Sequence, residues 1–309
     1  MRNTELPTTQ LGRSGMEISR VGFGTRGIGG GSEPHGDESV AVIHRALELG
    51  VNWIDTAAGY GFGRSEEIVG RALQGLGEKP YVFTKASLVE GPGRRAVHSV
   101  RRDSILREAE ASLRRLGVDA IDLYQIHWPI PDADVEEAWS ALAELREQGL
   151  VRHLGVSEFD VEQLRRIQSI APVEALQAPY SLIGREIEEE ILPYAEREGI
   201  GVIVSSPMGS GLLTGERIES ASEDGWRRHD SRFQEPQLSE SLDLAERLQA
   251  IASWLDTYPG ALAVAWTLRN PAVDGAIVGF RRPGDVYPII GAASLELDED
   301  DIAMIEGRA

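Results

Sequence analysis

The feature that most constrains the fold is a short apolar segment followed by a longer segment of helical period, a unit that recurs along the chain. Eight apolar segments have the pattern of buried strands: residues 20–24, 51–55, 81–85, 121–127, 152–157, 175–177, 201–205 and 274–278. The amphipathic segments are 39–49, 64–73, 103–116, 135–145, 161–170, 186–198 and a long stretch at 239–268. Buried strands joined by helices pair in parallel, and eight of them can close a barrel.

We therefore predict an α/β chain with one (β/α)8 TIM-barrel domain over residues 1–309. A short β-hairpin around Gly12 and Gly15 is expected to precede the first barrel strand. Residues 206–236 form the longest irregular connection, and they are expected to be an active-site loop.

Composition narrows the class of protein. The 309 residues are 41% hydrophobic, and the formal net charge is −19, which argues against a nucleic-acid partner. The chain has no cysteine, so disulfides, thiolate catalysis and Cys-ligated metals are excluded. It shows no signal-like N-terminus and no apolar run near the roughly 18 residues that a membrane helix needs. We expect a cytoplasmic protein without a membrane partner; the oligomeric state is left open.

One glycine pattern resembles a dinucleotide-binding turn. Gly22, Gly24 and Gly27 fit G-x-G-x-x-G after a predicted strand. In a Rossmann unit a helix follows the turn at once, whereas here further glycines and Pro34 delay any helix until about Asp37. The sequence therefore predicts a loop at the barrel mouth.

Polar side chains end several predicted strands, which is where a barrel places its catalytic groups. They are Asp55, Lys85, His127, Ser157, Gln177 and Ser205, and Tyr60 follows the second strand closely. Each could by itself be a cap, a loop residue or a buried imidazole. Together they supply a carboxylate, an ammonium, an imidazole and a phenol at one predicted rim, which indicates an active site.

Several motifs resemble those of the aldo-keto reductases over nearly the whole chain. They are Val21-Gly-Phe-Gly-Thr25, Ile54-Asp-Thr-Ala57, Gly59-Tyr-Gly61, Ser65-Glu66, Phe83-Thr-Lys85, Ile121-Asp-Leu-Tyr-Gln-Ile-His127, Gly155-Val-Ser157, Gln177-Ala-Pro-Tyr180 and Gly211-Leu-Leu-Thr-Gly215. The resemblance implies a (β/α)8 barrel, a nicotinamide cofactor, usually NADPH, and a small-molecule carbonyl substrate. It also implies a catalytic tetrad of Asp55, Tyr60, Lys85 and His127, and no metal.

The tetrad suits carbonyl reduction, in which negative charge develops on the carbonyl oxygen. Tyr60 is the expected proton donor, and a neighbouring Lys85 would lower the phenol pKa from its usual value of about 10. Asp55 would hold the ammonium, and His127 would orient the substrate oxygen. The cofactor supplies the hydride.

The resemblance also implies the cofactor contacts. Ser157 and Gln177 would hold the nicotinamide carboxamide, and Arg281 and Arg282 would suit a 2′-phosphate. The full expected set is Thr25, Arg26, Asp55, Ser157, Glu158, Gln177, Ser205, Pro207, Gly279, Arg281, Arg282 and Asp285. Candidate walls of the substrate pocket are Arg26, Phe62, Trp128 and Trp226.

Several positions depart from the family pattern. Glu158 stands where asparagine is usual, and Ser205 replaces an aromatic residue that often stacks on the nicotinamide. Asp285 and Ile289 replace glutamine and asparagine near the adenosine, which leaves NADH possible as the cofactor. Arg26 replaces an aromatic residue at the mouth, which favours an anionic or heavily hydroxylated substrate.

The sequence predicts an oxidoreductase that reduces an aldehyde or ketone, for example a sugar or hydroxylated carbonyl compound, with NADPH. Three alternatives remain open. The same site run backwards is an NAD(P)-dependent sugar or alcohol dehydrogenase. A cofactor-binding regulatory module similar to potassium-channel β-subunits would bind cofactor and serve a partner. An unrelated barrel lyase or hydrolase would need a metal cluster or paired carboxylates, which the sequence does not offer.

Overall fold

The barrel strands form a closed sheet in a computed structural model that describes residues 6–28, 36–215 and 230–308. Each strand pairs in parallel with the next along the chain, and the last pairs with the first. The strands are β3 (Val21–Gly24), β4 (Trp53–Asp55), β5 (Tyr81–Ala86), β8 (Ile121–Ile126), β9 (Val151–Ser157), β10 (Ala175–Pro179), β11 (Gly201–Ser205) and β12 (Gly275–Val278). The fold is therefore the predicted TIM barrel.

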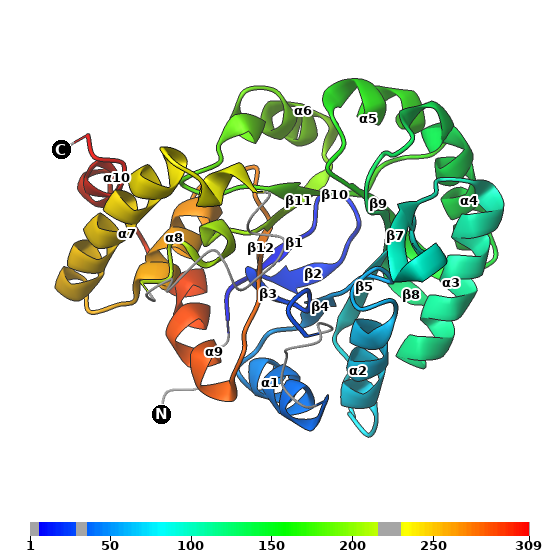
Figure 1. Cartoon of the computed structure of the whole chain (residues 1–309), viewed down its shortest axis with the longest axis horizontal. Coiled ribbons are helices and arrows are strands. Elements are labelled where there is room, and N and C mark those ends of the chain that lie inside the picture. The colour runs from blue at the N-terminus through cyan, green and yellow to red at the C-terminus, as the bar shows by residue number, and fades with distance from the viewer. Residues whose placement is uncertain (1–5, 29–35, 216–229, 309) are drawn as a thin grey trace.

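Helices surround the barrel, as Figure 1 shows. They are α1 (Gly36–Glu48), α2 (Arg64–Leu73), α3 (Arg102–Leu116), α4 (Val135–Glu147), α5 (Val161–Gln168), α6 (Ile191–Glu198), α7 (Gln237–Trp254), α8 (Pro259–Leu268), α9 (Pro283–Ile290) and α10 (Glu299–Ile305). The segment expected at 239–268 is two helices, because Pro259 lacks an N–H and starts a new helix. The short helices α9 and α10 were not predicted.

The N-terminal hairpin closes one end of the barrel. Its strands are β1 (Thr8–Gln10) and β2 (Glu17–Ser19), which lie across the centre of the ring in Figure 1. Hairpin residues Leu11, Met16 and Ile18 pack on barrel-interior side chains that include Trp53 and Phe83. The interior at this end is thus filled with apolar side chains, and the chemistry must lie at the opposite, C-terminal end.

A partly buried carboxylate ties the hairpin to the barrel. Asp274 accepts hydrogen bonds from the backbone N–H groups of Gly12 (3.0 Å) and Val202 (3.1 Å). Burial raises the pKa of this carboxyl to about 6, against the opposing effect of the two N–H donors and Arg20. Asp274 therefore belongs to the closed end of the barrel.

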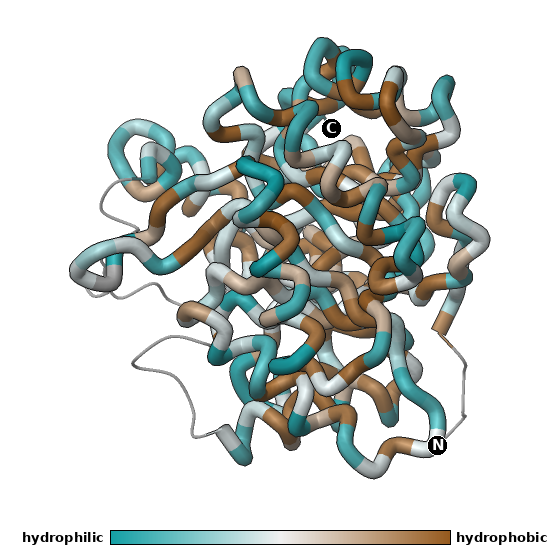
Figure 2. Tube along the Cα trace, turned by 90° about the vertical axis from the view of Figure 1, so that its right-hand side faces the viewer, coloured by the Kyte–Doolittle hydropathy of each residue, from teal (hydrophilic) through white to brown (hydrophobic). Residues whose placement is uncertain are grey.

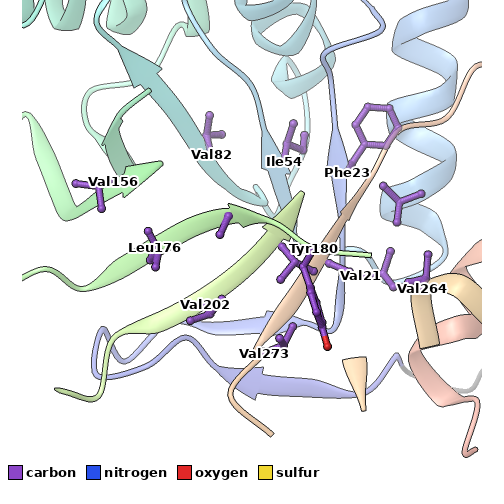
Figure 3. Packing of buried hydrophobic residues seen from close by; sticks show 14 of the residues in the cluster. Val21, Phe23, Ile54, Val82, Val156, Leu176, Tyr180, Val202, Val264 and Val273 are labelled. Carbon is purple, nitrogen blue, oxygen red and sulfur yellow. The ribbon is translucent and has the colours of Figure 1, made fainter. Parts of the chain in front are cut away.

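Most of the core lies between the barrel and the helices. Outward-facing strand residues, among them Val82, Val156, Leu176 and Val202 (Figure 3), belong to one apolar cluster with side chains of the helices. Hydrophobic stretches gather in the middle of the molecule, and hydrophilic ones lie mainly at its outside (Figure 2). Because successive side chains of a strand point to opposite faces, each strand contributes to two apolar layers, one inside and one outside the barrel.

The glycine pattern at the first barrel strand serves packing. A Cβ on Gly22 would come within 2.1 Å of the Trp53 side chain, so glycine makes room for that indole in the barrel interior. In the part of this segment that the structure describes, a turn and not a helix follows β3 at residues 26–28, and α1 is described from Gly36. The expectation that this is no Rossmann turn is confirmed.

An unpredicted hairpin extends the loop after β5. Its strands are β6 (Leu88–Gly91) and β7 (Arg95–His98), which pair antiparallel. The described parts of the long 206–236 loop contain two short 3-10 turns, Gly209–Gly211 and Ser231–Phe233. In the described residues no helix is long and apolar enough to cross a membrane.

Candidate active site

The four candidate catalytic side chains meet at the C-terminal end of the barrel. Asp55 ends β4, Lys85 lies near the end of β5, and His127 follows β8 directly. Lys85 Nζ donates to Asp55 Oδ1 at 2.6 Å and lies 5.3 Å from the centre of the Tyr60 ring. The Tyr60 and His127 rings meet edge to face, with centroids 5.5 Å apart. The structure thus brings together the groups that the sequence placed at one rim.

Asp55 is held from across the barrel as well. Its second oxygen, Oδ2, accepts hydrogen bonds from Gln177 Nε2 at 2.9 Å and from Gln125 Nε2 at 3.5 Å. Lys85 also donates to the Thr56 carbonyl at 2.9 Å. Gln125 was missed in the sequence, although it lies two residues before His127 and therefore shares its side of β8.

The ion pair is fully enclosed. Lys85 is 0% exposed and Asp55 is 2% exposed. Burial lowers the pKa of Lys85, but the negative charge of Asp55 and the Tyr60 phenol raise that pKa by more, so it lies above its ordinary value. The ammonium therefore stays protonated in this environment.

The pKa of Tyr60 differs from the expectation. Burial raises this pKa above its ordinary value and outweighs the lowering by Lys85, the largest opposing influence. Arg26 also lowers the pKa of Tyr60, and Asp55 raises it. The predicted direction of the Lys85 effect is right, but the predicted net shift is wrong for the protein alone, because desolvation of a phenolate is costly.

His127 is a neutral imidazole. Burial, followed by the positive charges of Lys85 and Arg26, lowers the pKa of His127 well below its ordinary value. The ring stacks on Trp128 with centroids 4.0 Å apart. Its buried Nδ1 has no hydrogen-bond partner among the described residues. A neutral ring carries one N–H donor, which suits contact with a carbonyl oxygen.

The candidate nicotinamide contacts lie on adjacent strands. Ser157 and Gln177 are paired positions of β9 and β10, so their side chains point to the same side. Gln177 gives its amide N–H to Asp55, as described above. Glu158 follows in a left-handed conformation (φ 60°) with an exposed side chain, and Ser205 ends β11 partly buried.

Thr25 has a local structural role. Its hydroxyl donates to the Asp55 carbonyl at 3.0 Å, and Ser65 Oγ donates to Thr25 Oγ1 at 2.7 Å. These contacts join the ends of β3 and β4. Thr25 therefore supports the backbone that carries Asp55.

The candidate phosphate contacts lie at the start of α9. Gly279, Arg281 and Arg282 are exposed after β12. Asp285 accepts a hydrogen bond from the Arg282 backbone N–H at 2.9 Å and so caps the helix. The Asp285 carboxylate therefore lies at the N-terminus of α9, close to Arg281 and Arg282 in the chain, where a cofactor phosphate is expected. Pro207 is buried in the turn after β11.

The candidate substrate residues surround the mouth. Arg26 is exposed two residues after β3 and acts electrostatically on both Tyr60 and His127. Phe62 is partly buried in a left-handed turn (φ 53°), and Trp128 is partly buried beside His127. Trp226 lies outside the described residues. Over the described ranges, no three His, Asp or Glu side chains are grouped to hold a metal ion.

Comparisons with known proteins identify the family. The model of the aldo/keto reductase family matches residues 20–308. The chain is 38% identical to aldo-keto reductase YhdN of Bacillus subtilis, over 95% of this chain and 90% of that protein. It is 33% identical to an NADH-specific methylglyoxal reductase of Escherichia coli, over 97% of each.

A solved structure supports the same family. The glycerol dehydrogenase AKR11B4 of Gluconobacter oxydans superposes with a TM-score of 0.90 at 36% identity, over 100% of this chain and 95% of that one. Sequence, barrel topology and these matches agree: the chain is an oxidoreductase and belongs to the aldo/keto reductase family.

Proposed function

We propose that this protein reduces the carbonyl group of a small oxygenated aldehyde or ketone with NADPH, and that Tyr60, Lys85, Asp55 and His127 carry the chemistry. The observation that carries the proposal is the buried Lys85–Asp55 pair beside Tyr60 and His127 at the open end of the barrel. Since buried ion pairs contribute little net stability, the place of this pair supports a role in the chemistry rather than in folding.

The roles follow from the charges. Tyr60 O–H donates a proton to the carbonyl oxygen as negative charge develops there. The Lys85 ammonium stabilises the phenolate that remains, and Asp55 fixes the ammonium in place. The neutral His127 donates a hydrogen bond that orients the carbonyl oxygen. A bound reduced nicotinamide supplies the hydride.

The residues present fit such a cofactor. Ser157 and Gln177 offer a hydroxyl and an amide oxygen at paired strand positions, which suits a carboxamide. Arg281 and Arg282, at the N-terminus of α9, suit phosphate groups. The Asp285 carboxylate at the same helix end opposes an additional 2′-phosphate, and one relative is NADH-specific. NADH is therefore the alternative cofactor.

Replacing Arg281 with Ala is expected to weaken NADPH binding by at least about tenfold, because a charge-assisted contact to the 2′-phosphate is lost. NADH, which lacks that phosphate, should bind nearly unchanged. Dissociation constants for both cofactors in wild type and variant measure this. Arg13→Ala in the hairpin at the other end of the barrel is the control. An equal effect on the two cofactors would show that Arg281 does not read the 2′-phosphate.

For the substrate we propose a small carbonyl compound that carries a carboxylate or several hydroxyls. The exposed Arg26 guanidinium acts on both Tyr60 and His127, so it lies near the expected position of the carbonyl. The names of two relatives, a methylglyoxal reductase and a glycerol dehydrogenase, also point to small oxygenated molecules.

Arg26→Gln is expected to lower kcat/KM for succinic semialdehyde by about tenfold and to leave butanal within about twofold, because one charged hydrogen bond is lost. Steady-state rates with both substrates measure the ratio, and butanal serves as the internal control. An equal loss of kcat/KM on the two substrates would show that Arg26 supports the structure of the site and does not recognise the substrate carboxylate.

The function itself is tested by mixing protein with NADPH or NADH and a panel of aldehydes, while the absorbance of the reduced nicotinamide is followed. Turnover is expected. Cofactor binding without turnover would favour the regulatory module, and no binding would contradict the proposal. Oxidation of polyols with the oxidised cofactor, faster than reduction of the aldehydes, would favour the dehydrogenase direction.

A further inference from the structure

A strained turn begins two residues after Lys85. Strand β5 ends at Ala86, and Ser87 follows in a left-handed backbone conformation with φ 82°. Residues other than glycine rarely adopt this conformation. All three polar groups of Ser87 are held. Its N–H donates to Glu108 Oε2 at 3.0 Å, its carbonyl accepts from Ser99 N at 3.1 Å, and its hydroxyl lies 3.3 Å from both the N and the O of Trp128.

The carboxyl that holds this turn comes from the middle of α3. Glu108 is 8% exposed, and its Oε1 accepts from Ser104 Oγ at 3.0 Å. The backbone N–H of Leu88 is a further donor to the same carboxyl. Glu108 touches none of the four candidate catalytic side chains by any described contact, so an effect on the reaction must pass through the turn.

The turn contacts both walls of the active site. Leu88 packs directly against Gly59, where an added Cβ would come within 2.4 Å of Leu88 Cδ2, and Gly59 precedes Tyr60. On the other side, the Ser87 hydroxyl holds the backbone of Trp128, whose ring stacks on His127 at 4.0 Å. One turn therefore supports the proton donor and the imidazole together.

We propose that Glu108 is a positioning residue for the reaction: its buried carboxyl fixes the Ser87–Leu88 turn and, through that turn, the places of Tyr60 and His127. The proposal rests on the function proposed above. It adds a residue of α3 whose described hydrogen bonds go to Ser87 and Ser104 and not to the four candidate catalytic side chains.

The charge of Glu108 provides a specific readout. Burial raises the pKa of Glu108 to about 7, against the lowering by Ser104 and by the Ser87 and Leu88 N–H groups. These donors bind the ionised form more tightly, because hydrogen bonds to a charged acceptor are stronger. The turn should therefore be held most firmly above about pH 7 and less firmly below it.

The groups near Glu108 and its turn that can carry charge are Glu66, Arg115, Tyr124 and His98, and the His98 ring meets the Trp128 ring edge to face at 5.3 Å. His98 is the same in wild type and in a Glu108 variant, so it does not enter the ratio of their kcat values. Glu66 on α2 raises the pKa of Glu108, and Glu66 is itself paired with Arg115 of α3. Tyr124 on β8 faces the same region, and its pKa lies well above its ordinary value, so it stays neutral. In the candidate active site, the pKa of His127 is lowered and those of Tyr60 and Lys85 are raised, which moves all three away from pH 7.

Glu108→Gln mimics the protonated carboxyl permanently, because its amide oxygen can accept from the backbone and its NH2 can donate to Ser104. We expect the ratio of kcat in the variant to kcat in wild type to be near one at about pH 6. It should fall to roughly one tenth at about pH 8, a loss of the size that small misplacements of reacting groups produce. KM for the cofactor should not change.

The matched control is Asp274→Asn at the closed end of the barrel. Asp274 is a partly buried carboxylate that also accepts two backbone N–H groups, with a pKa raised to about 6. Its kcat ratio should stay near one at both pH values. A second variant, Ser87→Gly, keeps the Glu108 carboxyl but loses the hydroxyl contact to Trp128, so it should lower kcat at both pH values. It tests the role of the turn even if Glu108→Gln does not fold.

Hydrogen exchange of residues 86–91 separates this proposal from the proposed function, because it needs no turnover. At about pH 8 these amides should exchange faster in Glu108→Gln than in wild type, and at about pH 6 the two should match. A kcat ratio that does not change with pH would overturn the proposal, as would slower exchange in the variant. If wild type reduced no carbonyl while the exchange result held, the proposed function alone would fail.

Discussion

Tyr60→Phe is expected to reduce carbonyl turnover by roughly 10³-fold while cofactor affinity stays near the wild-type value. Loss of a positioned acid removes about 10² to 10⁴ in rate. The proposed cofactor contacts lie on β9, β10 and the start of α9, so the phenol oxygen is not needed to bind the cofactor. Steady-state kcat and a cofactor titration of the same preparation measure the two effects.

Tyr258→Phe is the matched control, because that tyrosine is 52% exposed just before α8 and is none of the candidate catalytic, cofactor or substrate residues. Its activity should equal that of wild type. Turnover by Tyr60→Phe within about threefold of wild type would remove Tyr60 from the role of acid, since the loss expected for a general acid is far larger. The proton would then have to come from another group.

Lys85→Met is expected to cost both stability and activity. Removing the ammonium leaves the Asp55 carboxylate buried without its counter-charge, and breaking such a pair costs about 3–5 kcal/mol. The hydrogen bonds from Gln177 and Gln125 remain and keep part of the site in place. Turnover should fall by at least about 100-fold, because a charge that stabilises the phenolate is lost. Denaturant unfolding and kcat measure the two effects.

The chain offers a close control, since Lys79 is its one other lysine and is exposed before β5. Lys79→Met should change the free energy of unfolding by less than about 0.5 kcal/mol, as surface substitutions usually do, and leave turnover unchanged. A stable, active Lys85→Met would contradict both the assigned role and the energetic cost of the buried pair.

Much of the architecture follows from local patterns. The eight barrel strands begin and end within a few residues of the predicted limits. Buried strands and amphipathic helices each have a recognisable spacing of hydrophobic residues in the sequence. The convergence of Asp55, Lys85 and His127 was predictable for the same reason, since parallel strands all end at one rim. The place of Tyr60 at the same rim was predictable because it comes shortly after β4.

Other features depend on contacts that no local pattern records. The bonds from Gln125 and Gln177 to Asp55 join residues 70 and 122 positions apart. The Ser87 turn needs a carboxyl from α3, 21 positions away. The net shift of the Tyr60 pKa depends on how completely the fold excludes water around the phenol, and that is a property of the whole site. The capping role of Asp285 required α9, a helix that contains Pro288 and therefore does not look helical in the sequence.

The most direct test of the central claim is a single turnover with reduced nicotinamide cofactor that carries deuterium at both C4 positions. Wild type and Tyr60→Phe are each loaded with this cofactor and mixed with succinic semialdehyde, and the alcohol is analysed by mass spectrometry. Wild type should yield alcohol with one deuterium on the former carbonyl carbon, and Tyr60→Phe should yield almost none in the same time. Alcohol without deuterium, or equal yields from the two proteins, would contradict the assignment of this barrel mouth as a hydride-transfer site with Tyr60 as its acid.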